Sequence, residues 1–149
     1  AGQIVAGGTL EQLAALADNP PEGARVRPLQ VAGAFHTSYM EPAVAALSEF
    51  AASLEVRDPA VKIWTNSNGS TIASGADYLA SLVSQVSNPV RWDLCMASML
   101  EAGVTGIIEV APAGTLVGLA KRSMPGVETL AVKTPDQIHA ALELAAKHA

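Results

Sequence analysis

The sequence predicts an α/β fold built around a largely parallel sheet. Short apolar segments of strand length alternate with segments of ten or more residues whose apolar positions recur at helical spacing. Breaks rich in Pro, Gly and Asn separate these segments, and several helix starts carry Ser or Thr with a polar residue three positions later. Strands that alternate with helices favour parallel pairing, because a parallel connection needs a long crossover.

The N-terminal part of the chain predicts a strand, a helix and a second strand. The first strand covers residues 3–6 and ends at two glycines. Thr9 and Gln12 have the spacing of a capping box, which starts a helix that ends at Asn19 before two prolines. Residues 25–31 alternate in character, and we expect an extended, partly buried strand there.

The central part predicts a helix, a strand and a turn. Ser38 and Glu41 have the spacing of a helix cap, and apolar residues then recur every three or four positions until the break at 58–59. A strand is expected over 61–65 because apolar and polar residues alternate there. The run of Asn, Ser and Gly at 66–69 is a strong turn signal.

The C-terminal part predicts further alternation of helices and strands. Ser74 caps one helix, and Pro89 suits the first position of the next helix, whose apolar stripe includes Cys95. The remaining predicted elements are a strand over 106–110, a helix over 115–122, a strand over 129–132 and a helix after a capping box at 134–137.

The composition describes a folded, aliphatic protein. Of the 149 residues, 50% are hydrophobic, 4% aromatic and 15% charged, which excludes disorder and predicts a core of Ala, Val, Leu and Ile. A net charge of −5 argues against nucleic acid or an anionic membrane as a partner. No apolar run approaches the ~20 residues of a membrane span. The lone Cys95 cannot form an internal disulfide, so we expect a reducing, cytoplasmic location.

His36 is the first residue that could carry chemistry. It follows an apolar run at the predicted exit from a strand and precedes the helix expected near Ser38. The positive end of a helix disfavours imidazolium, so a histidine there would be a neutral general base. The alternative interpretation is a turn histidine that only contacts the backbone.

The other candidate residues have structural interpretations. Cys95 lies in a helical apolar stripe and is expected to be buried and inert. His139 and His148 do not have metal-ligand spacing, and no metal site is predicted. Lys121 and Arg122 suit either an anionic partner or a helix C-terminus. No Gly-x-Ser-x-Gly nucleophile motif occurs in the sequence.

Four blocks of the sequence together carry a family pattern. They are residues 31–43 with Leu47, Gln85 with 88–92, 109–122, and 3–7. These blocks resemble the malonyl-CoA:acyl-carrier-protein transacylases, whose active-site histidine lies in the first block. The acyltransferase domains of polyketide and fatty-acid synthases share that first block. One departure is Ala-Pro-Ala at 111–113, where the family has Gly-Pro-Gly.

The resemblance implies a ping-pong malonyl transfer. A serine attacks the thioester of malonyl-CoA, and His36 corresponds to the base that takes its proton. Gln85 matches the residue whose backbone carbonyl orients that histidine. Phe35 matches the form associated with malonyl units, since a bulky ring leaves little space for a branch methyl. Carrier-protein docking through Lys121 and Arg122 is a weaker expectation. No bound cofactor is implied, and the substrates are malonyl-CoA and phosphopantetheinyl acyl carrier protein.

The resemblance covers only the C-terminal half of the family. The nucleophilic Ser, the Arg for the malonyl carboxylate and the oxyanion donor would lie upstream, so an N-terminal part of the same enzyme is the expected partner. The start on Ala1 without Met agrees with that expectation. Residues 1–32 would end a ferredoxin-like small subdomain, and 33–149 would form the C-terminal part of a hydrolase-like large subdomain. The alternatives are a non-catalytic scaffold or carrier-docking fragment, and a piece of a polyketide-synthase acyltransferase domain.

Overall fold

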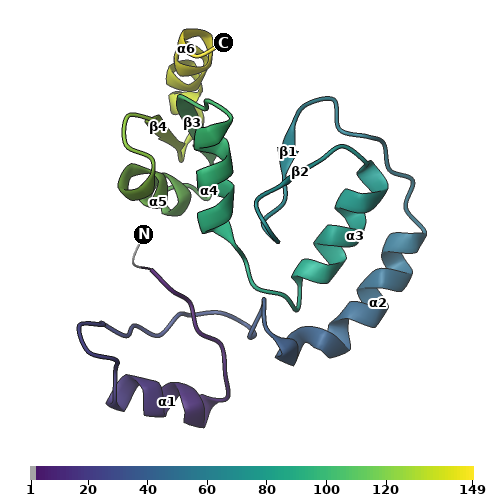
Figure 1. Cartoon of the computed structure of the whole chain (residues 1–149), viewed down its shortest axis with the longest axis vertical. Coiled ribbons are helices and arrows are strands. Elements are labelled where there is room, and N and C mark those ends of the chain that lie inside the picture. Colours follow the sequence, from purple (N-terminus) through teal and green to yellow (C-terminus); the bar gives the residue numbers. More distant parts are fainter. Residues whose placement is uncertain (1–2) are drawn as a thin grey trace. The chain divides into compact units, whose positions relative to one another are not determined.

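The computed structural model describes residues 3–149, in which helices and strands alternate only from α4 onward (Figure 1). These residues form two compact units. One comprises 3–67 and 71–90, and the other comprises 68–70 and 91–149. Each unit is described by itself.

The unit of residues 3–67 and 71–90 is mainly helical. Helix α2 packs against α3, and α3 also contacts β2. The hydroxyl of the buried Thr65 lies 2.9 Å from the Oγ of Ser81, which ties the segment after β1 to α3. The elements of this unit are α1 (Leu10–Asp18), the 3₁₀ helix η1 (Ser38–Met40), α2 (Glu41–Ala52), β1 (Ile63–Trp64), β2 (Thr71–Ile72) and α3 (Gly75–Gln85).

The unit of residues 68–70 and 91–149 contains a parallel β-α-β motif. Strand β3 pairs with β4 in parallel, from Gly106 opposite Glu128 to Val110 opposite Val132, and α5 connects the two strands. Met96, Ala120 and Met124 form a buried core between helices and strands. The elements are α4 (Trp92–Glu101), β3 (Gly106–Val110), α5 (Thr115–Ser123), β4 (Glu128–Val132), the 3₁₀ helix η2 (Pro135–Gln137) and α6 (Ile138–Lys147).

Several local predictions are confirmed. The parallel pair was predicted at 106–110 and 129–132, and the observed strands agree within one residue. Thr9 and Thr134 both form complete capping boxes, since each side chain and its partner glutamine bond reciprocally to the backbone. Ser74 accepts a hydrogen bond from the N–H of Asp77 and caps α3 as expected. Cys95 is buried, and burial raises the pKa of its thiol.

Three strand predictions are wrong in whole or in part. Residues 3–6 and 25–31 do not form strands among the described residues, although their sequence has strand character. A strand exists only through its ladder, and Ile4 and Val5 are 93% and 70% exposed. The strand expected over 61–65 is reduced to β1, which pairs antiparallel with β2 as a hairpin rather than joining a parallel sheet.

Two predicted helix starts are also wrong. Ser38 belongs to η1, and α2 begins only at Glu41, with no side-chain cap from Ser38. Helix α4 begins at Trp92, three residues after Pro89. Asn88 instead completes the preceding helix, because its Nδ2 donates 2.8 Å to the carbonyl oxygen of Ser84 near the end of α3.

Two further features concern the described residues as a whole. None of the helices within 3–149 combines the length and the apolar character needed to cross a membrane. Over the same range, no group of three His, Cys, Asp or Glu side chains has an arrangement that could hold a metal ion.

Candidate functional site

His36 lies in a turn just before η1 and has an unusual backbone conformation. Its φ is 66°, and it is the one non-glycine residue with positive φ in the part of the chain that the structure describes. A side chain in this region costs free energy that the surroundings must offset, and such residues cluster at functional sites. The backbone N–H of His36 donates to the carbonyl oxygen of Val86 at 2.9 Å, which holds the turn against the end of α3.

The imidazole of His36 is fixed by the same helix end. Its Nδ1 lies 2.6 Å from the backbone carbonyl oxygen of Gln85, the last residue of α3. Carbonyls in the last turn of a helix have no partner within the helix, so they are available as acceptors. Because a carbonyl oxygen can only accept, Nδ1 carries the proton in this contact, and a neutral ring then has its lone pair on Nε2.

The structure therefore brings His36 and Gln85 together. Both interpretations of His36 from the sequence predict a backbone contact, so the contact alone does not choose between them. Gln85 is 6% exposed, and its side-chain Oε1 is buried without a hydrogen-bond partner among the described residues. The sequence analysis expected a helix start at Ser38 to place a positive dipole end beside His36. It does not, because α2 begins five residues after His36.

Phe35 directly precedes His36 in the turn. Its ring is 53% exposed, so the described residues cover only about half of it.

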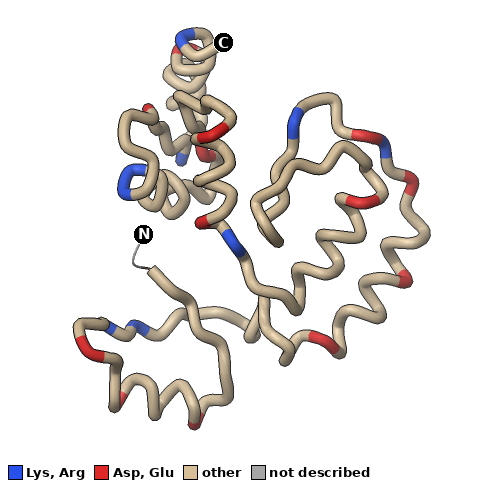
Figure 2. Tube along the Cα trace, in the orientation of Figure 1, with Lys and Arg blue, Asp and Glu red and all other residues tan. Residues whose placement is uncertain are grey.

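Lys121 and Arg122 lie in the other unit, in the last turn of α5, and both are exposed. Their place at a helix C-terminus is favourable for cations, which was the structural interpretation of these residues. Figure 2 shows Lys and Arg positions scattered along the trace rather than gathered in one run. The structure does not bring these two side chains together with the predicted site residues in one unit.

Glu109 is a positioning residue that the sequence analysis missed. Its carboxylate oxygens accept from the backbone N–H groups of Gly114 (2.9 Å), Leu116 (3.0 Å) and Val117 (3.0 Å) at the start of α5. Desolvation raises the pKa of Glu109, but hydrogen bonds from Val117, Leu116, Gly114 and Thr115 outweigh it, so the pKa lies below its ordinary value. The signal available in the sequence was a glutamate near the end of a strand, six residues before the first residue of a helix.

We expect the stability of the protein to depend on pH through Glu109. Because its folded pKa is lowered, the stabilisation is complete above the ordinary carboxyl pKa and is lost as the pH falls through the folded value. Glu109→Gln should therefore lower the thermal midpoint near pH 7, and the gap to the wild type should be smaller at about pH 3, below the ordinary carboxyl pKa. Thermal unfolding at both pH values measures this, with the exposed Glu49→Gln on α2 as the control. A gap that stays constant with pH would contradict the assignment.

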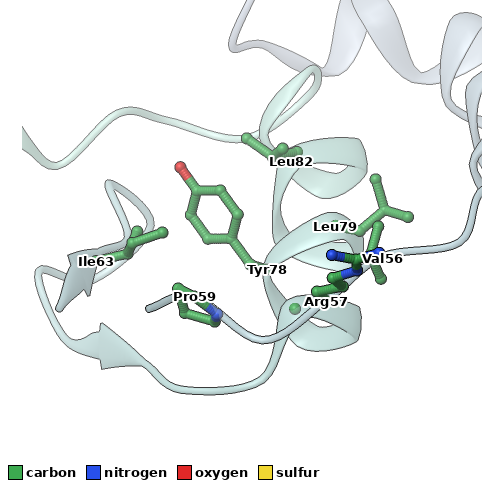
Figure 3. A pocket seen from close by; sticks show the side chains of 8 residues that line it. Val56, Arg57, Pro59, Ile63, Tyr78, Leu79 and Leu82 are labelled. Carbon is green, nitrogen blue, oxygen red and sulfur yellow. The ribbon is translucent and has the colours of Figure 1, made fainter. Parts of the chain in front are cut away.

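An apolar groove lies beside α3, with a volume of about 250 Å³. Figure 3 shows the ring of Tyr78, which extends from α3, between Ile63 of β1 and Leu82 of α3. None of the three predicted site residues in this unit lines the groove, so it is a separate feature. Its lining residues are Val56, Arg57, Pro59, Ile63, Gly75, Tyr78, Leu79 and Leu82.

Comparison with known sequences shows a consistent set of relatives. The malonyl CoA-acyl carrier protein transacylases of Mycobacterium tuberculosis and Mycobacterium bovis are each 50% identical over 135 residues, covering 91% of this chain and 45% of the relative. The transacylase of Mycolicibacterium smegmatis is 46% identical over 142 residues, covering 93% and 49%. The chain thus spans about half the length of the curated relatives it matches. No protein-family model matches the chain.

Comparison with solved structures gives the same relationship. The crystal structure of MCAT from Mycobacterium tuberculosis superposes with a TM-score of 0.85 at 47% identity, over 89% of this chain and 44% of that one. The malonyl-CoA:ACP transacylase of Synechocystis superposes with a TM-score of 0.82 at 28% identity, over 89% and 45%. These neighbours support the α/β class of the fold. By sequence and by structure, the chain is therefore similar to one part of the malonyl CoA-acyl carrier protein transacylases, and the match fits their C-terminal half.

Proposed function

We propose that the chain is the histidine-bearing part of an enzyme that transfers malonyl from malonyl-CoA to the phosphopantetheine thiol of acyl carrier protein in fatty-acid synthesis. The observation that carries this proposal is the 2.6 Å contact between His36 Nδ1 and the Gln85 carbonyl oxygen. This contact fixes the tautomer whose Nε2 accepts a proton. The transacylase names of the relatives supply the substrates.

The proposed reaction has two half-reactions. In the first, Nε2 of His36 takes the proton of a serine hydroxyl while the serine oxygen attacks the malonyl thioester carbon. The C–S bond breaks, and the proton passes from His36 to the departing thiolate of CoA. In the second, His36 takes the proton of the phosphopantetheine thiol, whose sulfur attacks the malonyl ester. The C–O bond breaks, and the proton returns to the serine oxygen.

The serine of this reaction is proposed to come from another part of the enzyme. The 149 residues contain no Gly-x-Ser-x-Gly motif, and the chain covers 45% of its mycobacterial relatives. We assign the Arg for the malonyl carboxylate and the oxyanion donor to the same part. In this proposal residues 1–32 end the ferredoxin-like small subdomain, and 33–149 belong to the hydrolase-like large subdomain.

The exposed surface supports a larger shared core. The chain exposes 10508 Å². The scaling of surface with mass gives only about 8,600 Å² even for two separate compact domains with the masses of the two units. The difference, roughly 1,900 Å², is more than twice the ~800 Å² that each partner buries in a standard interface.

The open face of the parallel strand pair is one place where that core would continue. Ile108 and Val110 point to the same side of β3, and they are 36% and 71% exposed. Parallel sheets occur almost only with both faces covered, because their strands are apolar on both sides. We propose that the further part of the enzyme covers this face.

Two further roles belong to the same proposal. Phe35 would form a wall of the acyl pocket, and its bulk would disfavour a methyl branch by ~1–3 kcal/mol, which favours malonyl over methylmalonyl units. Lys121 and Arg122 would help to dock the acidic carrier protein. Both assignments rest on the resemblance, and the exposure of these side chains is compatible with them.

A half-reaction assay tests the proposed function. The complete enzyme is incubated with radiolabelled malonyl-CoA alone, and we expect about one malonyl group per molecule to become bound as an ester, because ping-pong transfer does not need the acceptor. Addition of phosphopantetheinyl carrier protein should then move the label to its thiol. In parallel, methylmalonyl-CoA should label the enzyme at least ~10-fold more slowly.

The 149-residue chain is the matched control in this assay. It should not become malonylated, because it has no candidate nucleophile. If the complete enzyme takes no label without carrier protein, the ping-pong mechanism is wrong. If it transfers no malonyl at all but binds carrier protein, the scaffold interpretation replaces the enzyme.

A further inference from the structure

The turn that carries His36 rests on residues 7–12, which lead into α1 and include its first residues. This segment reaches the turn at two points, and all of these residues lie in the same unit. One point is a close approach of the backbone at Gly7, and the other is a hydrogen bond from Tyr39 to Gln12. Neither contact involves the residues that the resemblance marks as catalytic.

The contact at Gly7 leaves no space for a side chain. A Cβ on Gly7 would stand 2.6 Å from the Cγ2 methyl of Thr37, the residue directly after His36. Atoms at this distance overlap, so one of them must move. Thr37 cannot turn away without loss, because its Oγ1 donates a 2.6 Å hydrogen bond to the carbonyl oxygen of Ala34 and its β-branched side chain is stiff.

The second contact joins η1, which follows the turn, to α1. The hydroxyl of Tyr39 in η1 donates to Gln12 Oε1 at 3.2 Å. The same oxygen accepts the N–H of Thr9 in the capping box of α1. The start of α1 and the turn around His36 are therefore linked by side chains as well as by backbone packing.

We propose that the close approach of Gly7 to Thr37 is a positioning contact that keeps His36 in its left-handed conformation, with Nδ1 on the Gln85 carbonyl. The positive φ of His36 is costly and needs support from its surroundings. The hydrogen bonds from His36 hold the turn against the end of α3, and the Gly7–Thr37 contact packs it against the segment that leads into α1. Its effect on catalysis rests on the proposed function, while its effect on the imidazole does not.

The test is a double-mutant cycle in the complete enzyme with Gly7→Ala, Thr37→Ser and both changes. Gly7→Ala should lower kcat by about 10- to 100-fold with little change in KM, because a displacement of about 1 Å misplaces the base without removing a substrate contact. Thr37→Ser removes the methyl that clashes and keeps the hydroxyl that binds Ala34. The double variant should therefore recover the kcat of Thr37→Ser.

Gly118→Ala is the matched control, since a Cβ there meets no atom within 4 Å. ¹⁵N-histidine NMR of the same proteins reports the Nδ1 contact of His36. It should change strongly in Gly7→Ala, less in Thr37→Ser, which loses the methyl contact, and not in Gly118→Ala. Full activity and an unchanged spectrum in Gly7→Ala would overturn the proposal, as would a double variant no better than Gly7→Ala. If Gly7→Ala does not fold, the double variant must fold, and its failure would also overturn the proposal. Absence of malonyl transfer in the wild type would reject the proposed function alone, because the spectra still test the contact.

Discussion

Replacement of His36 by alanine in the complete enzyme is expected to slow malonyl transfer by ~10² or more, because the reaction loses the group that takes the serine proton. The loss should appear in kcat as well as in kcat/KM, since the imidazole acts on the reacting atoms rather than on substrate binding. Steady-state transfer of malonyl from malonyl-CoA to carrier protein measures it. His139→Ala is the control, because that side chain is 84% exposed on α6 and pairs only with a neighbouring glutamate in the described structure.

His36→Asn separates the two interpretations of this residue. Asparagine tolerates positive φ, and its Nδ2 can donate to the Gln85 carbonyl as Nδ1 of the histidine does. It has no group that can accept the serine proton. If His36 is the base, this variant keeps the thermal midpoint of the wild type within about 2 °C and loses transfer as fully as the alanine variant. If His36 only holds the turn, the asparagine variant keeps both the thermal midpoint and the rate of malonyl transfer.

The pairing of His36 with Gln85 was predictable because each residue lies in a short sequence motif. The family resemblance paired His36 with the backbone carbonyl of Gln85 before any geometry was known. The structure places Nδ1 of His36 2.6 Å from that carbonyl oxygen. That pairing came from resemblance. Composition and periodicity alone left His36 as one candidate among several, since a carbonyl partner 49 residues away leaves no trace in local sequence.

The elements that were mispredicted depend on partners outside their own segment. Strand character at 3–6 and 25–31 is real, but β structure needs a neighbouring strand, and the described residues do not supply one. The pair β3 and β4 was predicted correctly because both strands and their connecting helix are adjacent in sequence. Capping boxes at Thr9 and Thr134 were predictable for the same reason, since their partners lie three residues away.

Contacts that only the fold brings about could not be predicted. The carboxylate of Glu109 accepts from the backbone at the start of α5, and the methyl of Thr37 lies where a Cβ on Gly7 would stand. Residue type alone does not distinguish Glu109 and Thr37 from ordinary surface positions, although the place of Glu109 near the end of a strand was a signal. The contacts become visible only when the space around each backbone atom is known.

Gly75→Ala is expected to be strongly destabilising, at a position where helix propensity predicts the opposite. Gly75 is the first residue of α3, and alanine is favoured over glycine in helices by about 1 kcal/mol. Here a Cβ would stand 2.1 Å from the carbonyl oxygen of Arg57 and 2.6 Å from its carbon, and both atoms are backbone that cannot rotate away. The N–H of Gly75 also donates to Asp58 Oδ1 at 2.9 Å, so the helix start cannot shift without losing that bond.

We expect Gly75→Ala to lower the free energy of unfolding by about 3 kcal/mol, the upper range for inserting atoms into a closed space. Urea unfolding measures it, and Gly118→Ala in α5 is the matched control, which should raise stability by up to about 1 kcal/mol because its Cβ enters open space. The damage should reach the site as well. Helix α3 presents the Gln85 carbonyl to His36 at its other end, so displacement of its start moves the acceptor that fixes the imidazole. A variant as stable as the wild type would mean that the Arg57 carbonyl does not lie against α3, and the support of His36 by this helix would lose its basis.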